Sequence, residues 1–208
     1  MISYTITVHN EAEELNLLLN YLIPNITNED EIIIQSDSER VTEEVEDVVA
    51  NHIDKFPNII YVKFPLNNNF SDFKNNLKKH SSKKWIFNID ADEVPSDFLL
   101  QNLHLILNDN DGVEMILVPR WNLVEGITDE HVKKWGWKFD EQERINWPDY
   151  QTRIYLNSDN INWKNKVHER LEGFERYSAF PEEREFSLLH FKTIDKQEKQ
   201  NDFYTKMV

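Results

Sequence analysis

The 208-residue sequence contains no cysteine, which excludes a disulfide framework and a thiolate metal site. It also has no apolar run long enough to cross a membrane and no basic, apolar leader at its N-terminus. We therefore expect a cytoplasmic protein with no transmembrane segment. The formal net charge is −15 and no basic stripe is present, which argues against a nucleic-acid partner.

The composition is nevertheless that of a folded protein. Hydrophobic residues make up 39% of the chain and aromatic residues 12%, which is enough to build a core. The length fits one domain. We expect a single domain over residues 1–208, with a ligand-binding half at 1–120 and a second half at 121–208.

The first 120 residues alternate between the patterns of strands and helices. The predicted strands cover residues 2–8, 31–35, 58–64, 84–89 and 113–118. The predicted helices cover residues 15–22, 41–49, 70–77 and 95–107. Strict alternation indicates an α/β fold, with a mostly parallel central sheet and helices on both faces. Residues 121–190 lack long periodic patterns, so we expect short strands and loops folded over the open edge of the sheet, followed by a polar helix at 195–208.

Three carboxylates follow the fourth predicted strand, in the stretch WIFNIDADEVP from Trp85 to Pro95. In an extended backbone, Asp90 and Asp92 would point in the same direction. A divalent cation such as Mg²⁺ or Mn²⁺ would relieve their repulsion and keep positions open for phosphate. The acids could equally begin a helix, because acidic residues favour helix N-termini. The residues alone do not choose between these readings.

Several segments in order carry a family resemblance. The stretch FSDFKNNLKKHSSKKWIFNIDADE resembles the donor-site segment of family 2 glycosyltransferases. The resemblance also includes TITVHNEAEELNLLL, DEIIIQSDSERVTEEV, INWPDYQTRIYL, WKNKVHERLEG and LLHFK. It implies a GT-A fold and transfer of a sugar, with inversion, from a nucleotide-sugar donor to a glycan or other hydroxyl acceptor. A UDP-sugar is the expected donor.

The resemblance implies a set of donor-binding residues: Val8, Asn10, Glu11, Asp37, Lys74, Asn75, Asp90, Ala91 and Asp92. The first three would line the base pocket and Asp37 would take the base edge. Lys74 would approach the base or the diphosphate. No glycine follows Asp37, as it does in many relatives, so the base-binding acid could be offset by one position.

The resemblance also implies a metal and its ligands. Asp90 and Asp92 would form a DXD motif, in which Asp90 contacts the ribose and Asp92 holds Mn²⁺ or Mg²⁺. His190, near the end of the resemblance, is the candidate third ligand. A lone histidine at a strand end is also commonly structural, and both readings stay open.

An inverting transfer needs a base for the acceptor hydroxyl, and the resemblance places it at Asp149. If the segment is extended, Asp149, Gln151 and Arg153 would share one face; a turn at Pro-Asp is the alternative. The other expected acceptor-side and pocket residues are Glu93, Arg120, Trp121, Trp147, His168 and Glu169. Trp121 and Trp147 could provide an aromatic platform for a sugar.

Other functions fit less well. His168 and Glu169 suggest a zinc hydrolase, but that motif needs a second histidine at position 172, which is Glu. A sugar-nucleotide pyrophosphorylase needs a glycine-rich loop after the first strand, and the four glycines lie at 112, 126, 136 and 173. The acidic charge opposes a metal nuclease. A non-catalytic nucleotide- or sugar-binding module with the same fold remains the alternative.

Overall fold

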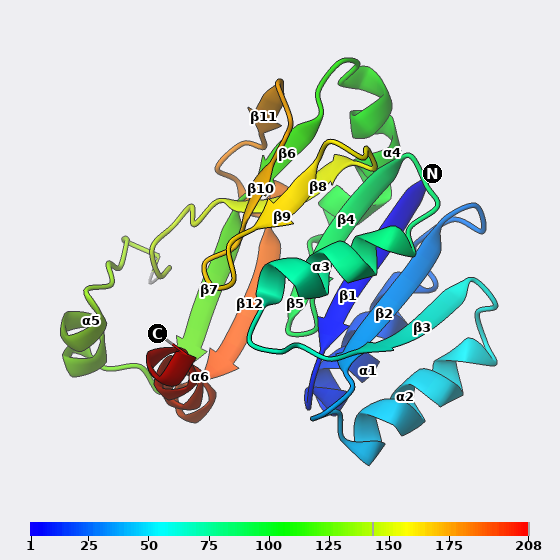
Figure 1. Cartoon of the computed structure of the whole chain (residues 1–208). Coiled ribbons are helices and arrows are strands. Elements are labelled where there is room, and N and C mark those ends of the chain that lie inside the picture. Colours follow the sequence, from blue (N-terminus) through cyan, green and yellow to red (C-terminus); the bar gives the residue numbers. More distant parts are fainter. Residues whose placement is uncertain (143, 208) are drawn as a thin grey trace.

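The computed structural model describes the backbone of residues 1–142 and 144–207 and, apart from residues 200 and 202–207, their side chains. At its centre is a seven-stranded sheet (Figure 1). Its strands are β1 (Ile2–Val8), β2 (Glu31–Asp37), β3 (Ile59–Phe64), β4 (Trp85–Asp90), β6 (Met115–Val118), β8 (Gln151–Leu156) and β11 (Tyr177–Ala179). They lie in the order β11-β6-β8-β4-β1-β2-β3. The five predicted strands are all present, and the prediction of a mostly parallel α/β sheet is confirmed.

The parallel strands bring their carboxyl ends to one edge of the sheet. β1 lies between β2 and β4, with Val8 opposite Ser36 and Thr7 opposite Asp90. Ligands of open α/β sheets bind at this edge. The register therefore places the end of β4, with its carboxylates, beside the end of β1.

Strand β8 differs from the sequence prediction. We expected residues 121–190 to lie over the edge of the sheet, whereas β8 inserts between β4 and β6 and pairs antiparallel with both. Ile154 and Tyr155 are almost completely buried, so the strand gains apolar burial on both faces of the sheet. The insertion brings Arg153 beside β4.

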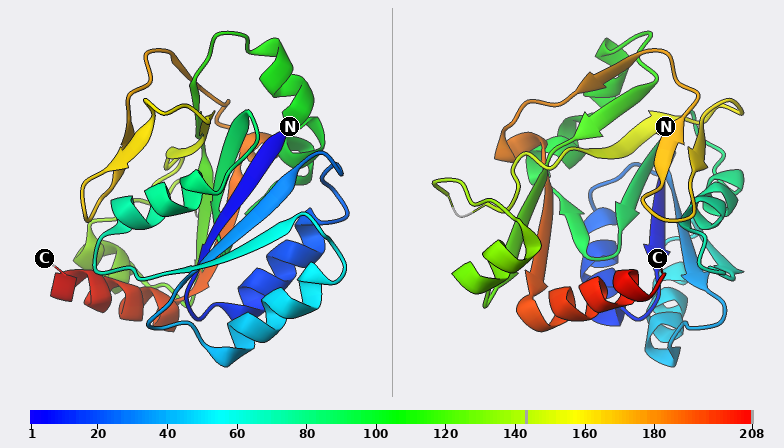
Figure 2. Two further views of the ribbon diagram at one scale, coloured as in Figure 1. Left: turned by 45° about the vertical axis from the view of Figure 1, so that its right-hand side comes forward. Right: turned by 60° about the vertical axis from the view of Figure 1, so that its left-hand side comes forward.

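Helices cover both faces of the sheet (Figures 1 and 2). Helix α3 (Phe70–Lys79) lies on one face, and α1 (Ala12–Leu22), α2 (Glu43–Ile53) and α4 (Asp97–Asp109) lie on the other. Their apolar positions follow the helical period, as in α1, where Leu15, Leu18, Leu19 and Leu22 are all fully buried. Helix α4 begins where Ser96 accepts a hydrogen bond from the Leu99 amide. The four predicted helices are confirmed.

The second half of the chain adds two small sheets. Strands β5 (Glu93–Pro95), β12 (Leu188–Thr193) and β7 (Arg120–Glu125) form one, in that order, and β9 (Asn162–Lys164) with β10 (Arg170–Glu172) forms the other. The remaining elements are α5 (Asp129–Trp135), η1 (Arg184–Phe186) and α6 (Ile194–Met207). Helix α6 confirms the predicted polar helix as far as residue 207; position 208 lies outside the described residues. In the part of the chain that the structure describes, no helix has the length and apolar character that a bilayer crossing requires.

Candidate active site

The turn after β4 separates the two aspartates. Asp90 ends the strand, Ala91 and Asp92 form a turn, and Glu93 begins β5. Asp90 Oδ2 accepts a hydrogen bond of 2.5 Å from Arg153, and Oδ1 accepts one of 3.3 Å from the Thr7 hydroxyl. The expectation of an extended backbone from Asp90 to Asp92 is therefore wrong, because the chain turns at Ala91 and Asp92, and Asp90 is held by an arginine.

Cations hold Asp90 in its ionised form. Burial works to raise its pKa, but the charges of Arg153, Lys74 and Arg120 outweigh burial and keep the pKa well below its usual range. These basic side chains of the protein thus neutralise the Asp90 carboxylate and reduce its repulsion with Asp92.

Glu93 is the centre of a buried ion-pair network. It is fully buried, and its Oε1 accepts hydrogen bonds from Arg153 at 2.6 Å and from Arg120 at 3.0 Å. Its Oε2 accepts the Asp90 amide at 3.1 Å. Glu93 therefore fixes the turn that carries Asp92 instead of opening a helix, and it ties β4 to β7 and β8.

Asp92 faces β12. Its Oδ2 lies 3.3 Å from His190 Nε2 and 3.1 Å from the Lys192 ammonium. His190 and Lys192 are two apart on the strand and so lie on the same side of it. Burial opposes ionisation of Asp92, but the hydrogen bond and charge of His190 and the charge of Lys192 lower its pKa to about 2.

These residues fit a divalent cation that is bound largely through its substrate. Ligands about 2.1 Å from an octahedral cation and at right angles lie about 3.0 Å apart, close to the 3.3 Å between Asp92 Oδ2 and His190 Nε2. Among the side chains that the structure describes, no group of three or more His, Asp or Glu residues is placed to hold a metal. Mg²⁺ commonly takes one or two protein ligands and fills its other positions with phosphate and water. A bound cation would compete with the Lys192 ammonium for Asp92.

Asp149 lies in a turn that precedes β8. Its amide bonds the Asn146 carbonyl at 3.0 Å and its φ is 39°. The side chain nevertheless reaches the site: Oδ2 accepts hydrogen bonds from Arg120 Nε at 2.8 Å and Asn122 Nδ2 at 2.6 Å, and Oδ1 accepts one from Gln151 at 3.0 Å. The turn and the polar wall are therefore both present, and Asp149 belongs to the wall by its contacts and not by strand alternation.

The expected base-pocket residues lie at the end of β1. Val8 is buried and Asn10 is exposed. The Glu11 carboxylate accepts the amides of His9 at 2.8 Å and Asn10 at 3.1 Å. Glu11 thus closes the turn into α1, and its contacts in this structure are local.

Asp37 ends β2 and is almost fully buried. Its Oδ1 accepts the amides of Glu39 and Leu66, both at 3.2 Å, and its Oδ2 lies 3.8 Å from Arg40 Nε. The amides hold the side chain at the carboxyl edge of the sheet. Asp37 is the last residue of β2, next to the end of β1. The turn that follows it has no glycine, but an acid still stands at the strand end where the base-binding acid was expected.

Helix α3 presents Lys74 and Asn75 to the β9–β10 hairpin. Lys74 Nζ pairs with Glu169 at 2.6 Å and lies 4.5 Å from the centre of the Trp163 ring. Both ends of the Asn75 amide bond the Trp163 backbone at 2.8 Å. Asn75 therefore anchors the hairpin, and Glu169 holds Lys74 near Asp90. His168 is exposed, with a φ of 54°.

The two expected platform tryptophans pack on each other and on arginines. The ring centres of Trp121 and Trp147 are 5.5 Å apart. Arg144 lies 4.2 Å from the Trp147 ring centre and 5.0 Å from that of Trp121, and Arg184 lies 5.4 Å from Trp121. The guanidinium groups cover part of the aromatic surface that a sugar would use.

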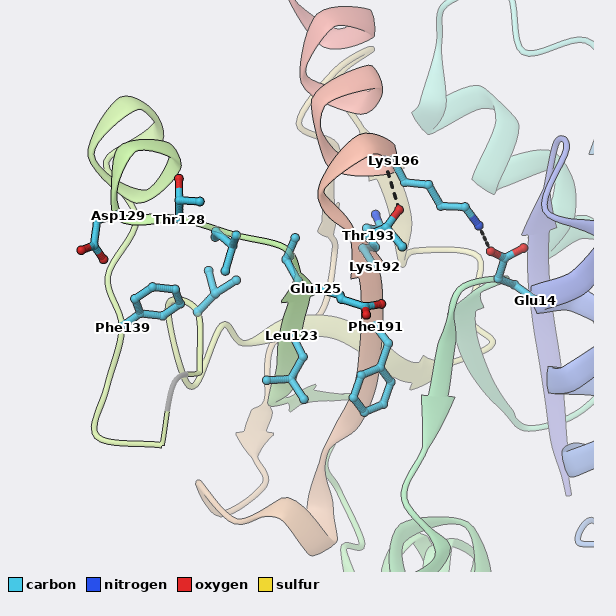
Figure 3. Close-up of a pocket in the computed structure, with 13 residues that line it drawn as sticks. Glu14, Leu123, Glu125, Thr128, Asp129, Phe139, Phe191, Lys192, Thr193 and Lys196 are labelled. Carbon is cyan, nitrogen blue, oxygen red and sulfur yellow. Dashed lines mark hydrogen bonds and ion pairs between the residues drawn. The ribbon is translucent and has the colours of Figure 1, made fainter.

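A cavity of about 830 Å³ lies beside the Asp92 end of the candidate site. The ends of β7 and β12, α5 and the start of α6 surround it (Figure 3). Lys192 lines this cavity and also contacts Asp92. Phe191 and Phe139 provide apolar walls, and Lys196 pairs with Glu14 across its edge. The cavity is thus connected to the candidate metal ligands through a single side chain.

Two residues of the site were missed by sequence reasoning. Lys192 follows His190 by two positions, and strand alternation alone could have placed it on the same side. Asn122 bonds both Asp149 and His190. Its only sequence signal is its place two residues after Arg120, which is too weak to find it.

Comparisons with known proteins agree with this architecture. The family model described as Glycosyl transferase family 2 matches residues 3–184. No match was found among curated proteins. Among solved structures, S. aureus TarS 1-349 is 12% identical with a TM-score of 0.62, over 96% of this chain and 62% of that one. The chain therefore spans less than two thirds of that structure, and the likeness shows a shared fold.

Two further structures add ligands to the comparison. TarS 1-349 in complex with UDP-GlcNAc is 11% identical with a TM-score of 0.60, over 92% of this chain and 58% of that one. The mannosyltransferase PcManGT from Pyrobaculum calidifontis, in complex with GDP-Man and Mn²⁺, is 14% identical with a TM-score of 0.48, over 57% of this chain and 35% of that one.

Proposed function

Since the chain belongs to glycosyl transferase family 2 and has the GT-A fold, we propose that it is a metal-dependent inverting glycosyltransferase. The substrate would be a nucleotide-sugar, and the acceptor a hydroxyl group of a glycan or another molecule. Asp149 acts as the general base, and Asp92 with His190 holds Mn²⁺ or Mg²⁺ at the donor diphosphate.

One observation carries this proposal. Asn122 links the proposed base to a proposed metal ligand, because it contacts Asp149 at 2.6 Å and His190 at 2.6 Å. Asp92 lies directly beyond His190. A sugar between the two carboxylates would have its leaving group on one side and the incoming hydroxyl on the other, as inversion requires.

The residues have separate tasks in this mechanism. Asp149 Oδ1 has one hydrogen bond, from Gln151, so it can take the proton of the acceptor hydroxyl. The hydroxyl oxygen then bonds to the anomeric carbon as the bond to the diphosphate oxygen breaks, and the nucleoside diphosphate leaves with that electron pair. When bound, the metal ion supplies positive charge to the leaving group. The Lys192 ammonium provides a further positive charge at the same place.

The nucleotide is proposed from the fold and from the edge of the sheet. TarS, which shares the fold, has been solved in complex with UDP and with UDP-GlcNAc. Asp37 and the end of β1 lie at the edge where such a base would bind. We therefore propose a UDP-sugar as the donor.

A non-catalytic nucleotide- or sugar-binding module is the second candidate. It is favoured by the ion pair between Lys192 and Asp92, which already neutralises the carboxylate without a metal. Such a module would bind a nucleotide-sugar equally well with and without divalent cation, and it would not turn the donor over.

Thermal unfolding with a panel of donors tests both candidates. UDP-, GDP- and CMP-sugars are added with and without Mn²⁺, and the melting temperature is measured. We expect one UDP-sugar to stabilise the protein only with Mn²⁺, by about 2.7 kcal/mol when its concentration is a hundredfold above Kd, and the Asp92→Asn variant to lose this effect. Stabilisation that does not depend on metal, without release of UDP, would favour the binding module.

A further inference from the structure

Asn122 lies between the proposed base, Asp149, and the proposed metal ligand His190. It lies on β7, directly opposite His190 on β12 in the parallel register of the two strands. Its side chain is nine-tenths buried. Asn122 Nδ2 lies 2.6 Å from Asp149 Oδ2, and Asn122 Oδ1 lies 2.6 Å from His190 Nδ1. A short neutral side chain thus connects a carboxylate on one side to an imidazole on the other.

The network determines which way the amide of Asn122 is oriented. A carboxylate only accepts hydrogen bonds, so the amide group that faces Asp149 is the NH₂. The carbonyl oxygen then faces His190, and because it only accepts, His190 Nδ1 must carry the proton. His190 Nε2 faces the Asp92 carboxylate, which also only accepts, so without a metal ion Nε2–H donates to Asp92. A cation bound at Asp92 would take the place of that proton, while Nδ1–H stays on Asn122.

This is the arrangement that a metal-binding histidine requires. Histidine ligands bind a metal through one nitrogen and donate the other N–H to a carbonyl or carboxylate, which sets the tautomer and the ring orientation. The same amide that orients His190 also supplies one of the three side-chain hydrogen bonds that orient Asp149. The two effects come from opposite ends of one group.

We infer that Asn122 is a positioning residue that holds His190 as an Nδ1–H tautomer for metal binding and, through its other end, orients the Asp149 carboxylate. This inference rests on the proposed function. Asn122 itself touches neither donor nor acceptor, and its effect passes through its two neighbours.

Two substitutions separate the two ends of the amide. Asn122→Leu removes the hydrogen bonds to Asp149 and His190, together with a long one of 3.5 Å to the Ile145 carbonyl, at nearly constant size. Asn122→Asp keeps an acceptor for His190 Nδ1–H but removes the donor to Asp149. Asn102→Leu is the matched control, since Asn102 lies on α4 and its side chain bonds the Phe98 carbonyl in its own helix.

The first readout is Mn²⁺ affinity, measured by titration calorimetry in the presence of UDP. We expect Asn122→Leu to weaken Mn²⁺ binding roughly 10- to 100-fold, and Asn122→Asp and Asn102→Leu to stay within about threefold of the wild type. Sugar transfer should fall in both Asn122 variants, because both lose the donor to Asp149. If Asn122→Leu does not fold, Asn122→Asp still tests the inference, because we expect this variant to bind Mn²⁺ like the wild type and yet to transfer sugar more slowly.

The second readout is the tautomer of His190 with Mg²⁺ and UDP bound, taken from ¹⁵N spectra of histidine-labelled protein above the pH range where free histidine titrates. The wild type and Asn122→Asp should show the Nδ1–H form, and Asn122→Leu a mixture. Unchanged Mn²⁺ affinity and an unchanged His190 spectrum in Asn122→Leu would overturn the inference and leave the proposed function standing. Wild-type protein that binds no Mn²⁺ with UDP would instead overturn the proposed function.

Discussion

The Asp149 carboxylate is held in one orientation by three side-chain hydrogen bonds. Arg120 and Asn122 bond one of its oxygens, at 2.8 Å and 2.6 Å, and Gln151 bonds the other. Its side chain is 24% exposed, so a substrate hydroxyl can reach it. These contacts come from β7 and β8, two strands that are distant from each other in the sequence.

Replacement of Asp149 by Asn should separate binding from chemistry. We expect Asp149→Asn to bind UDP and Mn²⁺ as the wild type does, because Asp92 and His190 are unchanged, and to lower kcat by about 10²- to 10⁴-fold. Calorimetry and a UDP-release assay measure the two quantities. Loss of donor binding in this variant would remove Asp149 from the role of base.

Arg153 stabilises the fold at the site by pairing with two carboxylates. It bonds Asp90 and Glu93 at 2.5 Å and 2.6 Å and is 3% exposed. Arg153→Met should lower the free energy of unfolding by about 3–5 kcal/mol, because Glu93 keeps only part of its compensating charge in a buried position. Urea unfolding measures this loss. The control is Lys63→Met, which breaks the exposed pair with Glu46 and should cost much less, because water and salt screen exposed pairs. Equal losses would show that the buried network contributes little.

Residues of the site differ in how far they could be predicted. Asp90, Asp92, Asp149 and His190 were found through motifs that resemble a family. Asn122 and Lys192 were not, since neither belongs to a motif and their importance comes from strand pairing between β7 and β12. The divergence of Asp90 from Asp92 also could not be predicted, because it depends on Arg153, which reaches Asp90 from a strand that lies more than sixty residues away in the chain.

Secondary elements in the first half follow from local periodicity. β1 to α4 have the alternating or helical apolar patterns that bury one face or both, so their order and type were predictable. β8 has an ordinary strand pattern, but its place between β4 and β6 depends on long-range pairing. Strands β9, β10 and β11 have three residues each, which is too short for a period to be recognised.

The β9–β10 hairpin depends on one glycine. Gly173 has a φ of +96°, and a Cβ there would lie 1.9 Å from the Asn160 carbonyl oxygen. Gly173→Ala should therefore lower the free energy of unfolding by more than Gly136→Ala. Gly136 also has a positive φ, of +67°, but a Cβ there meets nothing within 4 Å, so its substitution should cost only about 1–2 kcal/mol of backbone strain.

Urea unfolding and hydrogen exchange of the hairpin amides measure the comparison. Because Asn75 anchors the hairpin beside Lys74, Gly173→Ala should also increase exchange in β9. If Gly173→Ala and Gly136→Ala lost the same free energy of unfolding, the backbone near Asn160 would have to move away from the new Cβ at no cost, which would contradict this prediction.

The whole molecule should lose stability at alkaline pH. Burial is the main cause that raises the pKa of Tyr4 and of Tyr155 above the ordinary value, and both rings are almost fully buried. A raised pKa in the folded state means that the unfolded chain loses these protons first. The two neutral tyrosines thus contribute fully to the free energy of unfolding below a pH of about 10. Above that pH their contribution falls by about 1.4 kcal/mol per pH unit for each tyrosine.

Urea unfolding at increasing pH measures this slope. Tyr4→Phe removes one of the two groups and should reduce the slope above pH about 10 by the share of one tyrosine. An unchanged slope in Tyr4→Phe would mean that other groups cause the alkaline loss.

The architecture as a whole brings two carboxylates, from the turn after β4 and the turn before β8, to the two ends of one chain of contacts through Asn122 and His190. The claim that Asp92 and His190 hold a cation is tested most directly by anomalous diffraction at the manganese edge, from crystals grown with Mn²⁺ and UDP. We predict one peak within about 2.2 Å of Asp92 and of His190 Nε2, with Lys192 displaced from the carboxylate. A manganese peak elsewhere, with Lys192 still paired to Asp92, would contradict it.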